Sequence, residues 1–416
     1  MTNNNFSRLT INEWKQFDKI DIEFHPQLTV LTGANGCGKT TILNLLSRHF
    51  GWSHTELATP AEDETSGLFK FFARFFKSEI KTQEPIIGQL FYSNKSKANL
   101  TIANNNGNSA QYTVNINPQQ GIQGISIPSH RPTYFYRQVP HISTSKRSKK
   151  QAHNLATDSS RNYYFSGGGQ TSNYYLKETL LSWVIAGEGN KYIVPDKELK
   201  KHFEDFQEVL RKVLPPTIGF NEISIRNYEI VLITDTGDFM LDAVSGGVSA
   251  IIDLAWQIFT FRNDETEVLT VLIDEVENHL HPEMQRSIMP SLISAFPNCQ
   301  FIISTHSPLI VGSVKNSNVY AFRHKKIEGE KSYKVTNEKL DLVNKAKTAT
   351  EILNEVLGVP FTMPLWVESS LNEIVNKYSK TDIDQNTFDK MRSELKEIGL
   401  EELMPEAIKK SLKKND

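Results

Sequence analysis

One short stretch of this 416-residue chain constrains its fold more than any other. Residues 28–31 form an apolar run, Gly33 to Thr40 match the pattern G-x-x-x-x-G-K-[ST], and an apolar helical pattern begins at Thr41. A strand before the glycine-rich turn and a helix after it form the context that a phosphate-binding P-loop requires. The glycines let backbone N–H groups face phosphate oxygens, and the helix N-terminus adds partial positive charge. The sequence therefore predicts a P-loop.

Each residue of this loop has an expected role. Lys39 is expected to reach the β- and γ-phosphates, and the Thr40 hydroxyl to ligate Mg²⁺. The expected cofactors are therefore ATP and Mg²⁺. The predicted nucleotide-binding residues of the loop are Gly33, Ala34, Asn35, Gly36, Cys37, Gly38, Lys39, Thr40 and Thr41.

Two later apolar runs end in polar residues. Residues 268–273 read as a buried parallel strand that delivers Asp274 and Glu275 at its carboxyl end. Asp274 is expected to hold Mg²⁺ through water, and Glu275 to orient or deprotonate the attacking water. The next buried strand, residues 300–304, leads to His306, which could contact the γ-phosphate.

A second anion site is predicted in front of the helical pattern at residues 249–261. Ser245, Gly246 and Gly247 precede this helix. The serine hydroxyl and the backbone N–H groups at a helix N-terminus bind anions. We therefore add these three residues to the predicted nucleotide-binding set.

The bulk composition excludes some classes of protein. The chain has 46 Lys+Arg against 48 Asp+Glu, so no overall charge favours nucleic-acid binding, although local patches could bind it. Its two cysteines lack metal-ligand spacing and fit a reducing compartment. No signal pattern and no stretch of about 18 apolar residues is found. We expect a cytoplasmic protein that does not bind a membrane.

Three local features each allow two interpretations. Trp14 and Phe17, close to the P-loop strand, could stack on adenine or pack in the core. Residues 68–77 predict an amphipathic helix, placed either on a partner or DNA or on its own domain. The basic stretch from Lys146 to Lys150, with aromatic residues nearby at 163–165, could bind nucleic acid or form a solvated loop.

Taken together, these motifs resemble those of ABC-type AAA ATPases in the group that contains the structural-maintenance-of-chromosomes (SMC), RecF and OLD proteins. Residues 28–41 resemble the Walker A motif and Val271 to Glu275 the Walker B motif. Residues 245–247 resemble the signature motif, and Thr305-His306-Ser307-Pro308 the switch histidine of the OLD-like branch. The run Glu277-Asn278-His279-Leu280-His281-Pro282 is similar to OLD-like ATPases, whereas transporter ATPases usually carry Asp where His281 stands.

The resemblance implies an α/β fold of the ABC-type P-loop ATPase head. This fold has a mixed central sheet with helices, an antiparallel β lobe, a helical lobe insertion and here a small helical C-terminal region. The expected segments are residues 1–50 and 84–145 (N-terminal part of the head with the β lobe), 51–83 (helical insertion), 146–220 (basic loop and helical lobe), 221–325 (signature, Walker B, D-loop and switch histidine) and 326–416 (helical docking region).

The resemblance also implies how the site is completed. Two heads sandwich the nucleotide, so the signature residues act on ATP held by the other subunit of a homodimer or higher homo-oligomer. Val244 replaces the usual Leu before the signature. The Q-loop glutamine, which couples ATP to the helical lobe, has three candidates: Gln83, Gln89 and Gln138.

The C-terminal third distinguishes between related functions. OLD-type nucleases carry a Toprim domain, and Glu368 superficially resembles its first acidic residue. The usual Gly is missing after Glu368, and Asp382 and Asp384 follow too soon, in a polar turn. We therefore predict no nuclease active site in this chain. We expect helices at residues 347–356, 365–378, 385–398 and 401–413 instead.

Stand-alone ATPases of this group resemble the ATPase subunits of two-component bacterial anti-phage systems such as Septu and PARIS. This resemblance implies an ATP-hydrolysing sensor or scaffold that gates a separate nuclease or toxin, with a DNA or phage component as a possible trigger. The alternatives are a RecF-like repair ATPase that binds duplex DNA when ATP is bound, and a non-catalytic ATP-gated scaffold.

Overall fold

The structure is a computed structural model that describes most of the chain. Two compact units are distinguished, Met1–Ile352 and Leu353–Asp416, and each is described by itself. The described residues are 4–62, 69–72, 86–102, 110–131, 134–143, 145–166, 172–262, 268–326, 333–358, 364–378, 385–405 and 407–408.

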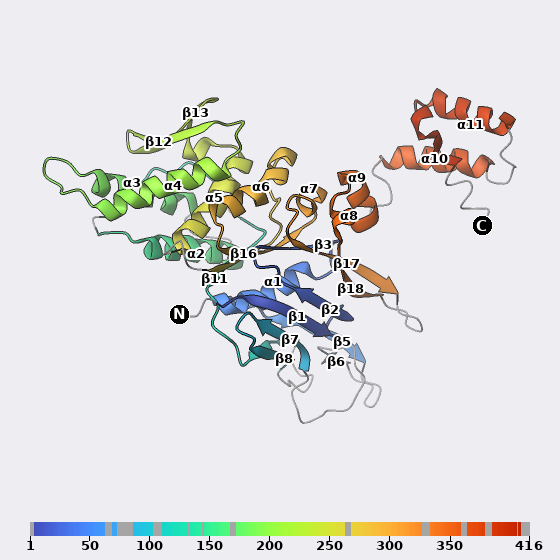
Figure 1. The fold of residues 1–416 in the computed structure, drawn as a ribbon, viewed down its shortest axis with the longest axis horizontal. Coiled ribbons are helices and arrows are strands. Elements are labelled where there is room, and N and C mark those ends of the chain that lie inside the picture. The colour runs from blue at the N-terminus through green and yellow to red at the C-terminus, as the bar shows by residue number, and fades with distance from the viewer. Residues whose placement is uncertain are drawn as a thin grey trace. The chain divides into compact units, whose positions relative to one another are not determined.

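A six-stranded sheet lies at the centre of the first unit (Figure 1). In spatial order its strands are β11 (Gly124–Ile127), β15 (Leu269–Ile273), β16 (Cys299–Thr305), β3 (Leu28–Gly33), β17 (Asn318–Lys326) and β18 (Tyr333–Lys339). All neighbours pair in parallel except β17 and β18, which are antiparallel. Every residue of β3, β15 and β16 is buried, as expected for parallel strands covered on both faces. The carboxyl ends of these three strands therefore meet at one edge.

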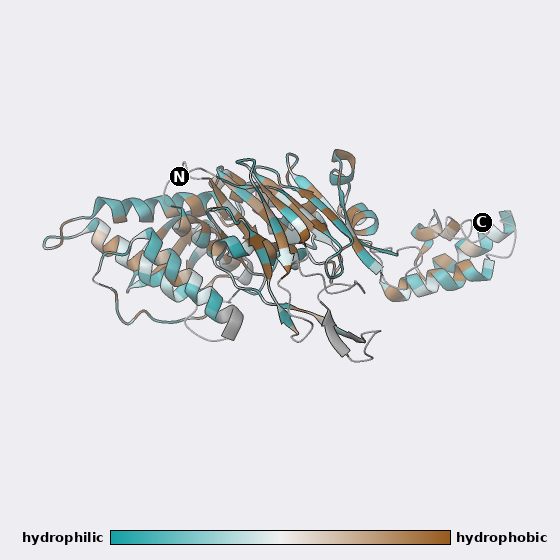
Figure 2. Cartoon of the chain, turned by 90° about the horizontal axis from the view of Figure 1, so that it is seen from below, coloured by the Kyte–Doolittle hydropathy of each residue, from teal (hydrophilic) through white to brown (hydrophobic). Residues whose placement is uncertain are grey.

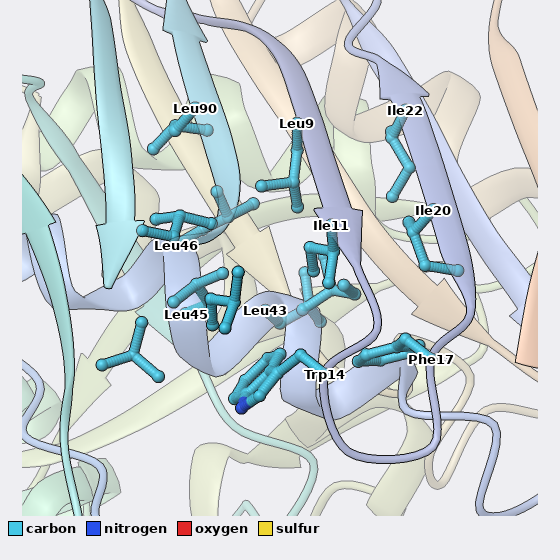
Figure 3. Close-up of a cluster of buried hydrophobic side chains, with 14 of the residues drawn as sticks. Leu9, Ile11, Trp14, Phe17, Ile20, Ile22, Leu43, Leu45, Leu46 and Leu90 are labelled. Atoms are coloured by element: carbon cyan, nitrogen blue, oxygen red, sulfur yellow. The ribbon is translucent and has the colours of Figure 1, made fainter. Parts of the chain in front are cut away.

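The same unit contains a second, antiparallel sheet. Its order is β10 (Val114–Asn117), β8 (Lys97–Ile102), β7 (Ile86–Tyr92), β1 (Phe6–Asn12) and β2 (Lys19–Glu23). Helix α1 (Lys39–Ser47) buries apolar residues in a cluster that contains side chains from both sheets (Figure 3). Trp14 and Phe17 are fully buried in this cluster, so core packing is the correct interpretation of both aromatics.

A helical lobe follows β11 in the chain. It contains α2 (Lys149–Ser166), α3 (Ser172–Glu188) and α4 (Lys197–Val213), then the small antiparallel sheet β12 (Phe220–Arg226), β13 (Glu229–Thr234) and β14 (Gly237–Met240). After a 3₁₀ turn, η2 (Leu241–Ala243), helix α5 (Gly246–Phe261) packs against α2 and α4, and α4 also contacts α6 (Pro282–Ala295). Asp196 caps α4 by accepting the N–H groups of Glu198 and Leu199.

The predicted helical insertion at residues 51–83 is wrong where the structure describes it. After the 3₁₀ turn η1 (Arg48–Phe50), β4 (Glu56–Leu57) pairs with β9 (Gln111–Tyr112), and β5 (Thr59–Glu62) pairs with β6 (Phe69–Phe72). The aromatic residues of β6 favour a strand as much as an amphipathic helix, and antiparallel pairing with β5 decides between them. The rest of the expected helix lies outside the described residues.

The predicted C-terminal helical region starts too early at residue 326. Strand β18 extends the central sheet to Lys339, and the first unit continues through α8 (Leu342–Lys345) and α9 (Ala349–Glu351) to Ile352. The second unit contains most of the π-helical turn η3 (Ile352–Val356), then α10 (Leu365–Tyr378), α11 (Gln385–Glu397) and η4 (Glu401–Leu403). Its small core includes Leu371, Met391 and Leu395.

The basic stretch is bound within the helical lobe. Lys146 pairs with Asp196 and Glu198, and Arg147 binds Glu178 through two hydrogen bonds of 2.8 and 3.0 Å. Arg147 is largely buried and is therefore not part of a solvated loop, whereas the Lys146 side chain is 51% exposed and stays solvated within its ion pairs. Their acidic partners are about 30 to 50 residues away in sequence, so composition alone could not reveal the pairing.

The predicted fold class is confirmed as a mixed α/β P-loop fold with a mainly parallel central sheet and antiparallel sheets. Apolar residues concentrate in the strands of the first unit (Figure 2), whereas α4 carries an apolar and a polar face. No helix in the described part of the chain is long and apolar enough to cross a membrane.

Candidate active site

The P-loop connects β3 to α1 and needs glycine at two positions. Gly33, at the end of β3, has φ +141°, and a Cβ there would lie 2.4 Å from the carbonyl oxygen of Phe322. Gly38, directly before α1, has φ +85°, and a Cβ there would lie 2.4 Å from the Phe17 ring. Both the left-handed backbone and the lack of space exclude larger residues. The loop predicted from the sequence therefore has the geometry that it needs.

Lys39 begins α1 and is 5% exposed. Its Nζ donates hydrogen bonds of 3.0 Å to the carbonyl oxygens of Gly33 and Ala34. Burial lowers the pKa of Lys39, while the nearby carboxylates of Asp274 and Glu275 favour its charged form. The cation is thus held inside the loop, at the position expected for the phosphates of a nucleotide.

Thr40 and Asp274 meet at the carboxyl ends of β3 and β15. The Thr40 hydroxyl lies 3.1 and 3.0 Å from the two Asp274 carboxylate oxygens, and the Ser304 hydroxyl donates to Oδ1 of Asp274 at 2.5 Å. Burial raises the pKa of Asp274, and the hydrogen bonds from Ser304 and Thr40 oppose this shift. Hydroxyl and carboxylate oxygens are the ligands that Mg²⁺ prefers, so this donor set fits the expected metal.

Glu275 follows Asp274 in a left-handed conformation with φ +46°, which costs a non-glycine residue about 1 kcal/mol. Its N–H donates to Ser304 Oγ at 2.8 Å, and its Oε2 accepts from Asn278 Nδ2 at 2.9 Å. Its other carboxylate oxygen lies 3.9 Å from Nε2 of His306. The side chain is about one-third exposed, so a fixed carboxylate remains accessible to a water molecule.

His306 follows β16, next to Glu275. Its backbone N–H donates to the Glu277 carboxylate, and its ring is about one-third exposed. Burial is the main cause that lowers the pKa of His306, and the charge of Lys39 lowers it further. A neutral imidazole can donate or accept one hydrogen bond at each nitrogen. The structure therefore places the predicted His306 beside the predicted base.

The three signature residues occupy the N-terminus of α5. Ser245 is the N-cap and accepts the Val248 N–H at 3.5 Å. Ser245 and Gly246 are exposed, whereas Gly247 is buried. A Cβ at Gly247 would lie 3.0 Å from the carbonyl oxygen of His279, which is a tight contact. The contacts described for Ser245 lie within its own helix, so its predicted role toward a second subunit stays a prediction.

His281, the unusual residue of the D-loop, has a structural role. It is the N-cap of α6, and its Nδ1 accepts the Glu283 N–H at 3.4 Å. Asp is a common residue at this position of a helix because its carboxylate makes the same contact. The imidazole therefore replaces a carboxylate as a cap.

Three residues beside the site were not predicted. Ser304 could have been found, because the parallel register that pairs Ile273 with Ile303 places it next to Asp274. Asn278 holds the Glu275 carboxylate and also donates to the Ser129 carbonyl at 3.1 Å. Arg131 is 6% exposed, and its Nη2 donates to the Glu275 carbonyl oxygen at 2.6 Å. No local sequence signal identifies Arg131, since it lies 144 residues before its partner.

The Q-loop candidates do not contact this site in the described residues. Gln89 donates to Asn99 within the antiparallel sheet, and Gln138 is exposed. Gln83 lies outside the described residues.

We use the term P-loop edge for a set of residues that meet at the carboxyl ends of β3, β15 and β16: Lys39, Thr40, Asp274, Glu275, Ser304 and His306.

Comparison with known proteins agrees with this geometry. A family model described as "AAA domain, putative AbiEii toxin, Type IV TA system" (AAA_21) matches residues 28–312, more than half of the chain. The chain belongs to the AAA_21 family. The matched region begins with β3 and ends directly after α7 (Pro308–Val311), so it contains the whole P-loop edge and the signature residues. The protein thus contains an AAA-type ATPase domain, which implies nucleotide binding.

Two relatives extend over most of the chain. One is the "Septu protein PtuA" of Bacillus thuringiensis, 23% identical over 91% of this chain and 93% of the relative. The other is the "Retron Ec83 probable ATPase" of Escherichia coli, 22% identical over 76% of this chain and 70% of the relative. Among solved structures, the SMC head domain from Thermotoga maritima matches with a TM-score of 0.40 and 14% identity over 81% of this chain and 99% of that domain.

Proposed function

We propose that this AAA_21 protein binds ATP with Mg²⁺ at the P-loop edge and hydrolyses it. One observation carries the proposal: Asp274 lies within 3.1 Å of both the Thr40 and Ser304 hydroxyls, and Glu275 follows it with an accessible carboxylate. The P-loop supplies the cation and the backbone turn for phosphates. The same edge therefore has groups for phosphate, metal and water.

Each residue has a role that its contacts support. Lys39 binds phosphate oxygens, and Thr40 with Asp274 holds Mg²⁺, which neutralises phosphate charge when it is bound. Glu275 orients the attacking water and accepts its proton, while Asn278 fixes the carboxylate. His306, at the end of the neighbouring strand β16, forms a hydrogen bond with the γ-phosphate.

We further propose that hydrolysis takes place between two subunits. Ser245 and Gly246 are exposed at the N-terminus of the 16-residue helix α5, where a hydroxyl, backbone N–H groups and the helix dipole can bind an anion. A second subunit's P-loop edge would present its nucleotide to this terminus. ATP then joins two heads, and hydrolysis releases them.

This cycle, in our proposal, gates a separate nuclease or toxin in anti-phage defence. The two relatives are named as a Septu protein and a retron ATPase, which supports a system with further components. The second unit offers exposed apolar residues at the start of α10, Leu365 at 80% and Trp366 at 62% exposure. Glu368 lies in the first turn of this helix, whereas a Toprim acid follows a strand.

The repair ATPase is the less favoured alternative. It would need a cationic surface for duplex DNA, and the structure assigns Lys146 and Arg147 to carboxylates of the helical lobe. ATP-dependent binding of duplex DNA that weakens steeply with salt would favour that alternative.

The test is a pair of assays on the purified full-length chain. We expect Mg²⁺-dependent release of phosphate from ATP, lost on chelation of the metal. We also expect DNA and RNA to stay intact with Mg²⁺ or Mn²⁺. Absence of ATP hydrolysis by wild type would contradict the enzymatic proposal. Degradation of nucleic acid by this chain alone, lost in Glu368→Ala, would contradict the gating proposal.

A further inference from the structure

A buried guanidinium lies behind the proposed base, and the ATPase roles assigned above do not use it. Arg131 follows β11, whose register pairs Ile127 with Ile273, so the segment after β11 runs beside the turn that carries Asp274 and Glu275. The backbone confirms this proximity, because the Asp274 N–H donates to the Ile127 carbonyl at 3.0 Å. Topology therefore brings Arg131 to the rear of the P-loop edge.

The contacts of Arg131 are unusual for a buried cation. Its Nη2 donates to the Glu275 carbonyl oxygen at 2.6 Å and lies 3.5 Å from the Asp274 carbonyl oxygen. Its Nε and Nη1 are buried without a hydrogen-bond partner in the described part of the chain. A buried polar atom without a partner is costly and requires an explanation. The one strong bond of this side chain goes to the backbone of the proposed base.

Acidic side chains surround this guanidinium. Asp253, 2% exposed on α5, and Glu277, after the Walker B strand, interact electrostatically with Arg131. Asp253 Oδ1 and Glu277 Oε2 are themselves buried without hydrogen-bond partners among the described residues. Desolvation lowers the pKa of Arg131, and these carboxylates partly oppose that shift.

The backbone of Glu275 explains what this bond does. With φ +46°, Glu275 adopts a conformation that a residue with a side chain rarely takes. Its N–H is held by Ser304 at 2.8 Å, its carboxylate by Asn278 at 2.9 Å and its carbonyl by Arg131 at 2.6 Å. All three contacts fix one residue, and Arg131 provides the shortest.

We propose that Arg131 is a positioning residue for ATP hydrolysis, because its guanidinium holds Glu275 in the left-handed turn that presents the carboxylate to the attacking water. The inference rests on the proposed ATPase function. It acts through Glu275 and not through the nucleotide, so loss of Arg131 should reduce turnover while leaving ATP affinity unchanged. A lysine keeps the charge and can donate from its single nitrogen, but it lacks the planar guanidinium.

The test compares Arg131→Met and Arg131→Lys with wild type in the full chain. We expect Arg131→Met to lower turnover about 100-fold, the loss typical of a misplaced catalytic group, with the ATP dissociation constant within about threefold of wild type. Arg131→Lys should recover part of that turnover. Arg147→Met is the matched control, because it removes a guanidinium that is also largely buried but binds Glu178 in the helical lobe. Its turnover should stay within about threefold.

A second readout separates positioning from general structural damage. In a Glu275→Gln background, adding Arg131→Met should leave residual single-turnover hydrolysis and ATP-dependent dimer formation unchanged, because the base is already absent. The inference is overturned if Arg131→Met and Arg131→Lys turn over at the wild-type rate, if ATP affinity falls as much as turnover, or if the double variant loses hydrolysis by the same factor as Arg131→Met alone. Should wild type itself lack ATPase activity, the proposed function fails and this inference with it. Wild-type activity that Glu275→Gln abolishes, together with active Arg131 variants, would overturn this inference alone.

Discussion

The P-loop edge and the C-terminal unit differ in how far their charged side chains are exposed to solvent. At the P-loop edge Lys39, Asp274 and, behind it, Arg131 are less than a tenth exposed, and each has several polar neighbours. In the C-terminal unit the pairs Lys377–Glu394 and Arg392–Glu401 lie largely in solvent. Buried charges are costly unless they are bound, whereas solvent screens exposed pairs. Buried and bound charges thus mark the region to which we assign chemistry, and docking of a partner on the C-terminal unit stays a proposal.

Removing the buried cation should have the largest effect. Lys39→Ala deletes the charge that faces the phosphates, and loss of a buried charged contact costs about 2–5 kcal/mol. We expect ATP affinity to fall by about 100-fold or more, measured by titration with a fluorescent nucleotide. The exposed Lys377→Ala is the matched control and should bind ATP as wild type does. Equal affinity of Lys39→Ala and wild type would show that the loop does not bind phosphate.

Blocking the signature should stop hydrolysis without affecting ATP binding to the single subunit. Ser245→Arg places a bulky cation where a second head must approach, and we expect turnover to be lost while the ATP dissociation constant is unchanged. Mixing this variant with Lys39→Ala should restore part of the activity, because a mixed dimer keeps one site with Lys39 from one chain and Ser245 from the other. If mixing at any ratio restores no activity, the site is not shared between subunits.

The positions of the acidic residues and His306 beside the P-loop could be predicted because parallel strands bring their carboxyl ends together. Asp274, Glu275 and His306 each follow a short apolar run, and a P-loop strand in the same sheet fixes where they meet. Arg131 could not be predicted, because its link to the site is one hydrogen bond to the backbone carbonyl of Glu275, which lies far along the chain. The helix expected at residues 68–77 failed where it is described because pairing between β5 and β6 overrides local pattern. Ser304 was not predicted, but the register of β15 and β16 is sufficient to place it beside Asp274.

Removing the C-terminal helices should have the smallest effect on catalysis. Residues 353–416 form a compact unit of their own and contribute no residue to the P-loop edge, so deleting residues 365–416 should leave ATP turnover within about twofold of wild type. The same deletion should abolish co-purification with an effector protein. A shortened chain that still binds the effector would assign docking to the first unit, and one that loses ATPase activity while remaining folded would remove the contrast between the two regions.

The account depends most directly on Glu275 as the base. The decisive measurement is the nucleotide found on Glu275→Gln after incubation with ATP and Mg²⁺ and gel filtration, together with the mass of the complex. The glutamine amide can hold water but cannot accept its proton, so hydrolysis should fall about 10²–10⁴-fold. We predict ATP rather than ADP on the protein, in a dimer or larger assembly. Wild-type hydrolysis by this variant, with ADP on a monomer, would contradict the account.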